Sequence, residues 1–248
     1  YHFKDLKKKL HYIKKYPNLI PYVTSYYKKD WGFCISYNDF KKLDKKSSYV
    51  VNIDSTFNKK GKLNYGEIYF PGESKKEIFF STYICHPSMA NNELSGPCLA
   101  IYLAKLISKK KNKYSYRFVF LPETIGSIYY LSKNLNNMKK HIIAGFNLTC
   151  VGDNREYSFL PSKYGNSLAD KVSLKLLRKS VKKFKTYTWL ERGSDERQYC
   201  SPGVNLPIAS IMRSKYHTYK EYHTSGDNLK DLVTAKGLNE SFNLFREV

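Results

Sequence analysis

From residue 77 onward, strand-like and helix-like segments alternate, and this alternation restricts the fold more than any other feature of the sequence. The strand-like segments are apolar and rich in β-branched and aromatic residues, and they cover residues 78–84, 116–121, 142–148 and 206–212. Apolar residues recur at helical spacing over residues 94–106, 125–135, 167–181 and 229–245. Strands that alternate with helices predict a mostly parallel sheet covered on both faces, so we expect an α/β class fold.

The first 47 residues do not follow this pattern. They mix Lys, Tyr and Leu, and Pro17 and Pro21 interrupt the helical stretches, so we expect a peripheral layer. Residues 48–54 and 65–70 have strand-like composition on either side of Lys60-Gly61, which predicts a hairpin. No repeat or low-complexity linker divides the chain, so one domain over residues 1–248 is the simplest expectation. The first residue is Tyr1, with no signal peptide after it, and we expect a fragment of a longer chain.

The charge balance is strongly basic, with 43 Lys and Arg against 21 Asp and Glu and a net charge of +22. Such a charge permits a nucleic-acid partner. However, much of the excess lies in runs such as residues 7–9 and 109–111, which are typical of solvated faces. The sequence has no zinc finger, RNP-like aromatic motif or Arg-rich recognition helix, so we do not expect nucleic acid to be the partner.

The cysteines and the apolar stretches indicate the compartment. Five Cys without a CxxC pair favour neither a disulfide framework nor a zinc site made of Cys alone. The longest apolar stretches are far shorter than the roughly 20 residues that a membrane-spanning helix needs. We therefore expect a cytoplasmic protein without a membrane span.

Polar side chains follow each predicted strand at the point where the strand ends. His86 follows the first strand, Glu123 the second, Gly152-Asp153 the third, and His223 comes after the last. In open parallel sheets the ligand crevice lies beyond the carboxyl ends of the strands. Imidazole and carboxylate groups are common zinc ligands. The sequence therefore predicts a metal site at this edge.

Each of these residues has a purely structural alternative. A His after a strand is often a surface residue, and Glu123 could cap the helix that begins near Ile125. For Asp195-Glu196 we expect a solvated turn, and for Asp227 the N-cap of a helix from Leu229 onward.

Four segments together carry a resemblance to a known family. They are residues 81–96 (STYICHPSMANNELSG), 122–127 (PETIGS), 193–203 (GSDERQYCSPG) and 221–225 (EYHTS). In this order they resemble a bacterial aminopeptidase-like family, a distant relative of the two-zinc aminopeptidases that is often encoded among polysaccharide-biosynthesis genes. The resemblance implies the zinc-exopeptidase fold, a three-layer α/β/α sandwich with a mostly parallel central sheet. It also implies a small β appendage, of which residues 48–72 would be the remnant, and a C-terminal winged-helix-like domain before which this chain stops.

The resemblance also implies roles for residues. His86 matches the first metal ligand, His223 the late His ligand and Glu123 the catalytic base. The positions of three expected carboxylates instead hold the neutral residues Asn92, Thr124 and Thr149.

Two neighbouring dications repel strongly unless a carboxylate bridges them, and Asn92 cannot replace that charge. We therefore expect one zinc ion rather than two. The third ligand stays open between Asn92, through its amide oxygen, and Glu93, with water in the remaining position. Thr124 would orient Glu123 or the substrate carbonyl, and Asp195 would support the site.

These expectations favour a metal-dependent hydrolase of the aminopeptidase type. It would cleave a peptide or amino-acyl amide, a small-molecule substrate, with Glu123 assisting attack by a metal-activated water. The link to polysaccharide biosynthesis rests on the resemblance alone. The alternative is a catalytically degenerate fold kept as a binding or scaffolding module, which would have no need of Glu123.

Overall fold

A seven-stranded sheet forms the centre of the molecule. The computed structural model describes residues 1–25 and 29–248. The strands are β3 (Gly66–Phe70), β4 (Ser74–Tyr83), β5 (Tyr114–Leu121), β6 (Ile142–Asn147), β7 (Ser158–Leu160), β8 (Lys185–Thr186) and β9 (Ile208–Met212). Their spatial order is β3-β5-β4-β6-β9-β7-β8. The four central strands are parallel, whereas β3 pairs antiparallel with β5 and β7 antiparallel with β9.

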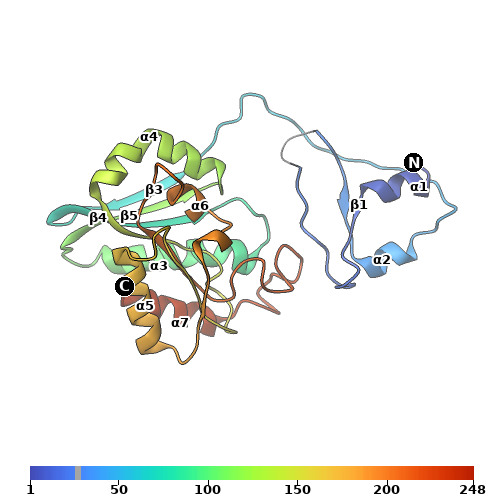
Figure 1. Ribbon diagram of the computed structural model, residues 1–248. Coiled ribbons are helices and arrows are strands. Elements are labelled where there is room, and N and C mark those ends of the chain that lie inside the picture. Colours follow the sequence, from blue (N-terminus) through green and yellow to red (C-terminus); the bar gives the residue numbers. More distant parts are fainter. Residues whose placement is uncertain (26–28) are drawn as a thin grey trace.

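Helices cover both faces of this sheet (Figure 1). They are α3 (Ser95–Ile107), α4 (Ile125–His141), α5 (Leu168–Ser180), α6 (Glu196–Tyr199) and α7 (Ala235–Arg246). Successive strand residues point to opposite faces, so Phe80 packs with α3, α5 and α7 whereas Phe79 packs with α4 and α6. The result is the predicted α/β/α sandwich. Among residues 1–25 and 29–248, no helix is long and apolar enough to cross a membrane.

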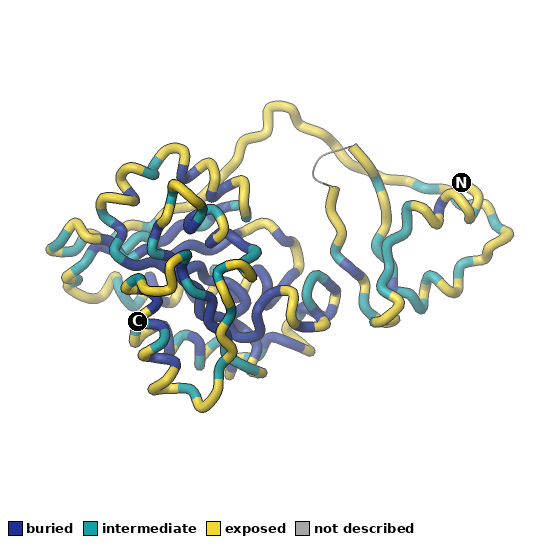
Figure 2. The backbone as a smooth tube through the Cα atoms, in the orientation of Figure 1, coloured by how far each residue is buried: buried dark blue, intermediate teal, exposed yellow. Residues whose placement is uncertain are grey.

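The N-terminal region lies beside this sandwich and carries a small sheet of its own (Figure 1). It contains α1 (Phe3–Leu6), η1 (Lys7–Lys9), β1 (Leu10–His11), β2 (Phe33–Cys34) and α2 (Tyr37–Lys42). β1 and β2 pair in parallel. Figure 2 shows that this region is mostly exposed or half-buried, whereas the strands of the sandwich are buried. It is therefore a peripheral layer, as the sequence predicts.

The expected hairpin of residues 48–54 and 65–70 is wrong. Residues 49–65 contain no strand, and β3 pairs with β5 at the edge of the main sheet instead. The apolar residues of β3 explain this choice, because Ile68 and Phe70 pack against the main core. Within residues 48–72 the one strand is β3, and it belongs to the main sheet.

The four strands and the first three helices of the sandwich form where the sequence predicts them. The last helix differs, since α7 begins at Ala235 rather than at Leu229. The hydroxyl of Thr234 caps it by accepting a hydrogen bond from the backbone N–H of Gly237 at 2.9 Å. Two short strands, β7 and β8, extend the sheet beyond the expected four and were not predicted.

One π-helical turn connects β4 to α3. This turn, η2 (Ala90–Leu94), leads directly into α3. Gly96 follows it, and a Cβ atom there would lie 2.3 Å from the carbonyl oxygen of Leu148. Only glycine allows α3 to approach the end of β6 this closely, and π-turns of this kind are frequent at functional sites.

Candidate active site

Three of the predicted site residues converge at the carboxyl edge of the sheet. Nε2 of His86, beyond β4, lies 3.7 Å from Oε2 of Glu123, beyond β5. The ring of His223, on the loop that follows β9, has its centroid 5.0 Å from that of His86. Both strand ends and the loop therefore deliver their polar side chains to one place.

Glu93 lies on the opposite side of the His86 ring from Glu123. Its carboxylate accepts hydrogen bonds from the backbone N–H groups of Cys85 and His86 at 2.5 and 3.0 Å. Its Oε2 is also 3.3 Å from Nδ1 of His86. A carboxylate on the far nitrogen fixes the orientation of a ligating imidazole. This geometry favours Glu93 as a support for His86 over Glu93 as a ligand beside Nε2.

Cys85 is a neighbour of the same imidazole nitrogen that the sequence did not single out. Its Sγ lies 3.1 Å from Nδ1 of His86 and accepts a hydrogen bond from the backbone N–H of Glu123 at 3.4 Å. Ligand atoms of Cys85, His86 and Glu93 all lie within 4.8 Å of one another, and among the described residues this is the one group of three His, Cys, Asp or Glu side chains that does so. Because Nδ1 and the Glu93 carboxylate already have protein partners, the Nε2 side is the better position for an ion.

Asn92 completes the Nε2 side. Its Oδ1 is 3.0 Å from Nε2 of His223, and its amide nitrogen donates to the hydroxyl of Tyr83 at 2.6 Å. The amide oxygen therefore points toward the histidines. His223 itself has a φ of 51°, a backbone conformation that residues other than glycine adopt rarely and mostly at functional sites.

Asp227 holds Asn92 in position. Its carboxylate accepts hydrogen bonds from the backbone N–H groups of Asn91 at 2.5 Å and Asn92 at 3.0 Å. The expectation that Asp227 caps a helix starting at Leu229 is therefore wrong. It caps η2 instead, because the loop after β9 folds back over the start of that turn.

Asp153 also has a structural role. It is buried, and its carboxylate accepts hydrogen bonds from the side-chain amide of Asn91 at 3.2 Å and from the backbone N–H of Ser214 at 2.9 Å. It links η2 to the loop after β9. The sequence placed it correctly at the sheet edge, but its carboxylate bonds to these neighbours.

The two threonines at expected carboxylate positions are engaged in the framework. The hydroxyl of Thr149 lies 2.5 Å from that of Tyr83 and donates to the backbone carbonyl of Asn92 at 3.2 Å. The backbone N–H of Thr124 donates to Asp195 at 2.8 Å. Neither threonine adds an anionic donor for a second ion.

Glu123 is held from two directions and does not cap α4. Its Oε1 accepts a hydrogen bond from the hydroxyl of Ser194 at 2.8 Å. The next residue, Thr124, is the N-cap of α4 and has a φ of 64°, a strained value that Asp195 stabilises through the N–H of Thr124. This turn directs the carboxylate of Glu123 toward His86 and away from the start of the helix.

The predicted solvated turn at Asp195 and Glu196 is wrong. Both residues are buried, with exposures of 0% and 1%. Glu196 accepts hydrogen bonds from the backbone N–H groups of Gly193 and Ser194 at 3.1 and 3.0 Å. The segment 193–196 is therefore a support for Glu123, and a Ser-Asp-Glu run gives no local signal that separates such a support from a surface turn.

Burial and neighbouring charges shift the pKa values of Glu123, His86 and His223, and they give the two histidines different protonation states. Burial raises the pKa of Glu123, and the Ser194 hydrogen bond and the charge of His86 oppose this. Burial disfavours the charged form of His86, but hydrogen bonds to Cys85 and Glu93 and the charge of Glu123 raise its pKa to about 10. Burial, together with the charge of His86, lowers the pKa of His223 to about 4. Without a metal, His86 is therefore cationic and His223 neutral, and an ion at Nε2 must displace the proton of His86.

A segment from the N-terminal region closes one side of the site. The backbone N–H of Tyr22 donates to the carbonyl of His223 at 2.7 Å, and Ser225 donates to the carbonyl of Ile20 at 2.8 Å. The Tyr22 ring centroid lies 5.5 Å from that of His86 and 5.4 Å from that of His223. Sequence reasoning missed Tyr22, because nothing local distinguishes it from the other tyrosines of a basic, Tyr-rich segment.

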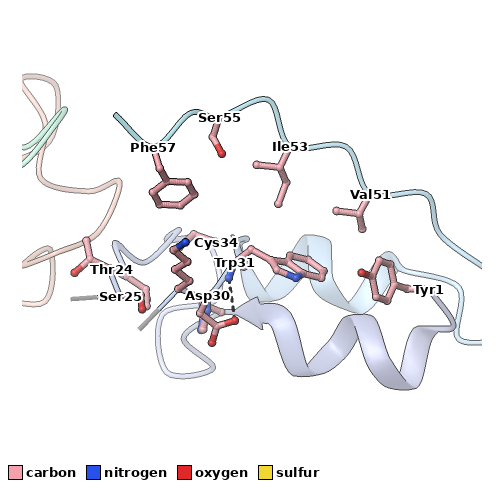
Figure 3. A pocket seen from close by; sticks show the side chains of 14 residues that line it. Tyr1, Thr24, Ser25, Asp30, Trp31, Cys34, Val51, Ile53, Ser55 and Phe57 are labelled. Carbon is pink, nitrogen blue, oxygen red and sulfur yellow. Dashed lines mark hydrogen bonds between the residues drawn. The ribbon is translucent and has the colours of Figure 1, made fainter. Parts of the chain in front are cut away.

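A cavity of about 840 Å³ lies in the N-terminal region, and neither His86 nor His223 lines it. Trp31 and Tyr1 line one wall of it, and Val51, Ile53 and Phe57 point into it from the extended segment opposite (Figure 3). The catalytic candidates described above do not line it. This cavity is therefore separate from the candidate site at the sheet edge.

The donor set at the sheet edge fits a zinc ion. Tetrahedral zinc with bonds of about 2.1 Å places neighbouring ligand atoms about 3.4 Å apart. Nε2 of His223 and Oδ1 of Asn92, two of the proposed ligand atoms, lie 3.0 Å apart, close to this separation. Two imidazoles and an amide oxygen are also donors that zinc accepts.

The fold is an α/β/α sandwich of the zinc-exopeptidase type. An aminopeptidase from Aneurinibacillus sp. strain AM-1 shares this fold with a TM-score of 0.61 and 18% identity, over 74% of this chain and 46% of that one. A zinc aminopeptidase from Bacillus subtilis shares it with a TM-score of 0.58 and 18% identity, over 73% of this chain and 48% of that one. At such identities the likeness concerns the fold.

The chain belongs to the family described as domain of unknown function DUF4910, whose model matches residues 7–248. It is 46% identical over 244 residues to a Clostridium acetobutylicum protein named for polysaccharide biosynthesis and an aminopeptidase-like domain, covering 98% of this chain and 55% of that protein. A crystal structure from Clostridium acetobutylicum, described as that of a peptidase, matches with a TM-score of 0.93 and 45% identity, over 98% of this chain and 57% of that one. The chain thus spans little more than half the length of these relatives.

Proposed function

We propose that the chain is the catalytic part of a zinc-dependent amide hydrolase of the aminopeptidase type, acting on a peptide or an amino-acyl amide. The observation that carries this proposal is the position of Glu123. Its carboxylate lies 3.7 Å from Nε2 of His86 and is held by Ser194 at 2.8 Å. A carboxylate fixed beside potential zinc ligands is the arrangement that hydrolytic metal sites need.

His86, His223 and Asn92 would hold the ion, and Glu93 would orient His86 from behind. A bound zinc ion supplies Lewis acidity, which polarises a carbonyl and makes water acidic. Asn92 and the two threonines are neutral where a two-ion site would need carboxylates, which supports one ion.

Glu123 takes the proton from the attacking water and returns it to the nitrogen of the leaving amine. Burial raises its pKa, which makes its carboxylate a stronger base than an exposed one. Ser194 keeps the carboxylate in place between the two transfers. Tyr22 excludes bulk water from the side of the histidines that it covers.

A degenerate binding module is the second candidate function. The neutral Asn92, Thr124 and Thr149 favour it, since a site that lost catalysis would tolerate loss of carboxylates. The elaborate support of Glu123 by Ser194 and Asp195 favours the enzyme, because a module that only binds has no need to hold a base.

The deciding experiment measures zinc content and hydrolysis of a panel of aminoacyl anilides and short peptides by the zinc-loaded protein. Glu123→Gln should keep zinc binding and melting temperature near wild type and lower turnover by about 10²-fold or more. His86→Ala should lose zinc and activity together, along with the stabilisation that zinc gives. Equal turnover of wild type and Glu123→Gln on a hydrolysed substrate would place the base elsewhere. No turnover across the panel, with zinc bound, would favour the binding module.

A cytoplasmic location in polysaccharide biosynthesis completes the proposal. All five cysteines are free, which suits a reducing compartment. The Clostridium acetobutylicum relative carries polysaccharide biosynthesis in its name. The expected ligand is a small amino-acyl molecule, because the basic excess lies largely in exposed lysines rather than at the sheet edge.

A further inference from the structure

Tyr83 is the last residue of β4 and adjoins the candidate site. It is buried, and its ring centroid lies 5.6 Å from that of His86. Its hydroxyl contacts two side chains, the amide nitrogen of Asn92 at 2.6 Å and the hydroxyl of Thr149 at 2.5 Å. A phenol has one proton to donate, so the directions of these two hydrogen bonds depend on each other.

A backbone carbonyl fixes both directions. The hydroxyl of Thr149 lies 3.2 Å from the carbonyl oxygen of Asn92, which can only accept, so Thr149 donates to it. The Sγ atom of Cys150, at 3.5 Å, is a second acceptor for the same proton. Because its proton is used in this way, Thr149 accepts from Tyr83, and the proton of the Tyr83 hydroxyl points to Thr149.

The orientation of the Asn92 amide follows from this. The two ends of an asparagine amide have nearly the same shape, so packing alone does not choose between them. Tyr83 has no proton left for Asn92 and can only accept from it, so the amide nitrogen must face Tyr83. The amide oxygen, Oδ1, then faces Nε2 of His223, which is 3.0 Å away.

The rest of Asn92 is held by other partners. Its backbone N–H donates to Asp227 at 3.0 Å, its backbone carbonyl accepts from Thr149, and the residue is 2% exposed. The choice that remains is which end of the amide faces the histidines. This choice matters for a metal, because an amide oxygen can bind a cation and an amide NH₂ group can only donate hydrogen bonds.

We propose that Tyr83 is a positioning residue, which together with Thr149 keeps the amide oxygen of Asn92 directed at the metal-binding side of His223. Two neutral hydroxyl groups thus control a neutral ligand atom. A carboxylate would need no such control, since both of its ends are oxygen atoms. The inference rests on the proposed function for the presence of an ion, but the orientation of the amide can be measured without one.

The first test uses metal-free protein at pH 8 and identifies the tautomer of His223 by ¹⁵N NMR, with His223→Gln to assign its signals. The wild type should carry the proton on Nε2, because that nitrogen donates to Oδ1 of Asn92. Thr149→Val frees the Tyr83 proton for Asn92, so the amide should flip and the His223 proton should move to Nδ1. Thr149→Ser keeps a hydroxyl and should keep the wild-type tautomer. A wild type protonated on Nδ1, or a Thr149→Val protein still protonated on Nε2, would overturn the inference.

The second test measures zinc affinity by chelator competition. Tyr83→Phe should weaken zinc binding by about tenfold or more, the usual effect of losing a partner that orients a ligand. In an Asn92→Asp background the same change should leave the affinity nearly unchanged, because either carboxylate oxygen can face the ion. Tyr199→Phe is the matched control, since Tyr199 is also buried and its hydroxyl contacts Ser81 at 2.8 Å, and it should keep wild-type affinity. A Tyr83→Phe protein with a lower melting temperature and unchanged zinc affinity would show a purely structural role and overturn the inference.

The two tests separate this inference from the proposed function. The expected tautomers in wild type and Thr149→Val, in a protein that binds no zinc, would support the role of Tyr83 and overturn the zinc-dependent hydrolase. Zinc-dependent hydrolysis with equal zinc affinity in wild type and Tyr83→Phe would overturn the role of Tyr83 and leave the hydrolase in place.

Discussion

Glu93 and Glu123 lie on opposite sides of one imidazole ring. Oε2 of Glu93 is 3.3 Å from Nδ1 of His86, and Oε2 of Glu123 is 3.7 Å from Nε2 of the same ring. One ring nitrogen is therefore available to an ion and the other is tied to the backbone of the turn through Glu93. The two carboxylates should respond differently to substitution.

Glu93→Gln should weaken zinc binding by about 10- to 100-fold, the usual effect of losing a carboxylate behind a ligating His. The amide keeps an oxygen for one of the two backbone N–H groups that Glu93 now accepts. Zinc affinity measured by chelator competition checks this, with Glu123→Gln as the comparison that should keep its affinity. A Glu93→Gln protein with wild-type zinc affinity would show that His86 needs no such support.

Asn92→Asp should tighten zinc binding by about tenfold or more, because it places a negative charge beside the ion. The zinc content should stay at one equivalent, since Thr124 and Thr149 remain neutral. Elemental analysis and affinity measurement check both points. Unchanged affinity would mean that Asn92 does not touch the ion, and two equivalents would mean that the threonine positions do not limit occupancy.

Asp195→Asn should change how stability depends on pH. Burial raises the pKa of Asp195 from 3.8 to about 8. The folded state then holds a proton that the unfolded chain releases. The contribution of Asp195 to stability is therefore fully present below pH about 4 and is lost as the pH rises through 8.

The asparagine variant lacks this titration and keeps an oxygen for the N–H of Thr124 and the hydroxyl of Ser127. Its free energy of unfolding, measured in urea, should therefore increase relative to that of the wild type as the pH is raised from 5 to 8. A constant difference between the two proteins over this range would show that Asp195 is ionised throughout.

Gly96→Ala should lower the free energy of unfolding by about 1–3 kcal/mol, the range of overpacked positions. Its Cβ would lie 2.3 Å from the carbonyl oxygen of Leu148 and 2.4 Å from the hydroxyl of Thr82. Gly66→Ala is the control, since its nearest neighbour would be an ordinary 3.8 Å contact with Phe120. Similar urea midpoints for both variants would contradict the close approach of α3 and β6.

The sequence predicted the central parallel sheet and its helices because these elements depend on local periodicity and on runs of apolar residues. It also placed His86, Glu123 and His223 at one edge, since that follows from strand order alone. The hairpin prediction was wrong because the strand-like composition of residues 65–70 does not show which strand pairs with them. The partner, β5, lies across a connection that includes β4 and α3.

The supports of the site could not be read from local patterns. Asp227 and Asp195 occur in short polar runs that resemble surface turns, yet both are buried and bind backbone N–H groups of distant segments. Glu93 was a ligand candidate by position in the chain, and only the rotation of the η2 turn directs it to the far side of His86. The roles of these three residues depend on how loops that are distant in the sequence pack against one another, and local sequence patterns do not show that packing.

The pairing of residues 20–22 with residues 223–225 also concerns how the protein is made. The two segments lie 205 residues apart in the chain, as between Ile20 and Ser225. A ribosome exposes Tyr22 early and His223 only near the end of this segment, so a nascent chain holds no closed site while most of its sheet is being built. The candidate site is therefore complete only after the loop that carries His223 has been synthesised.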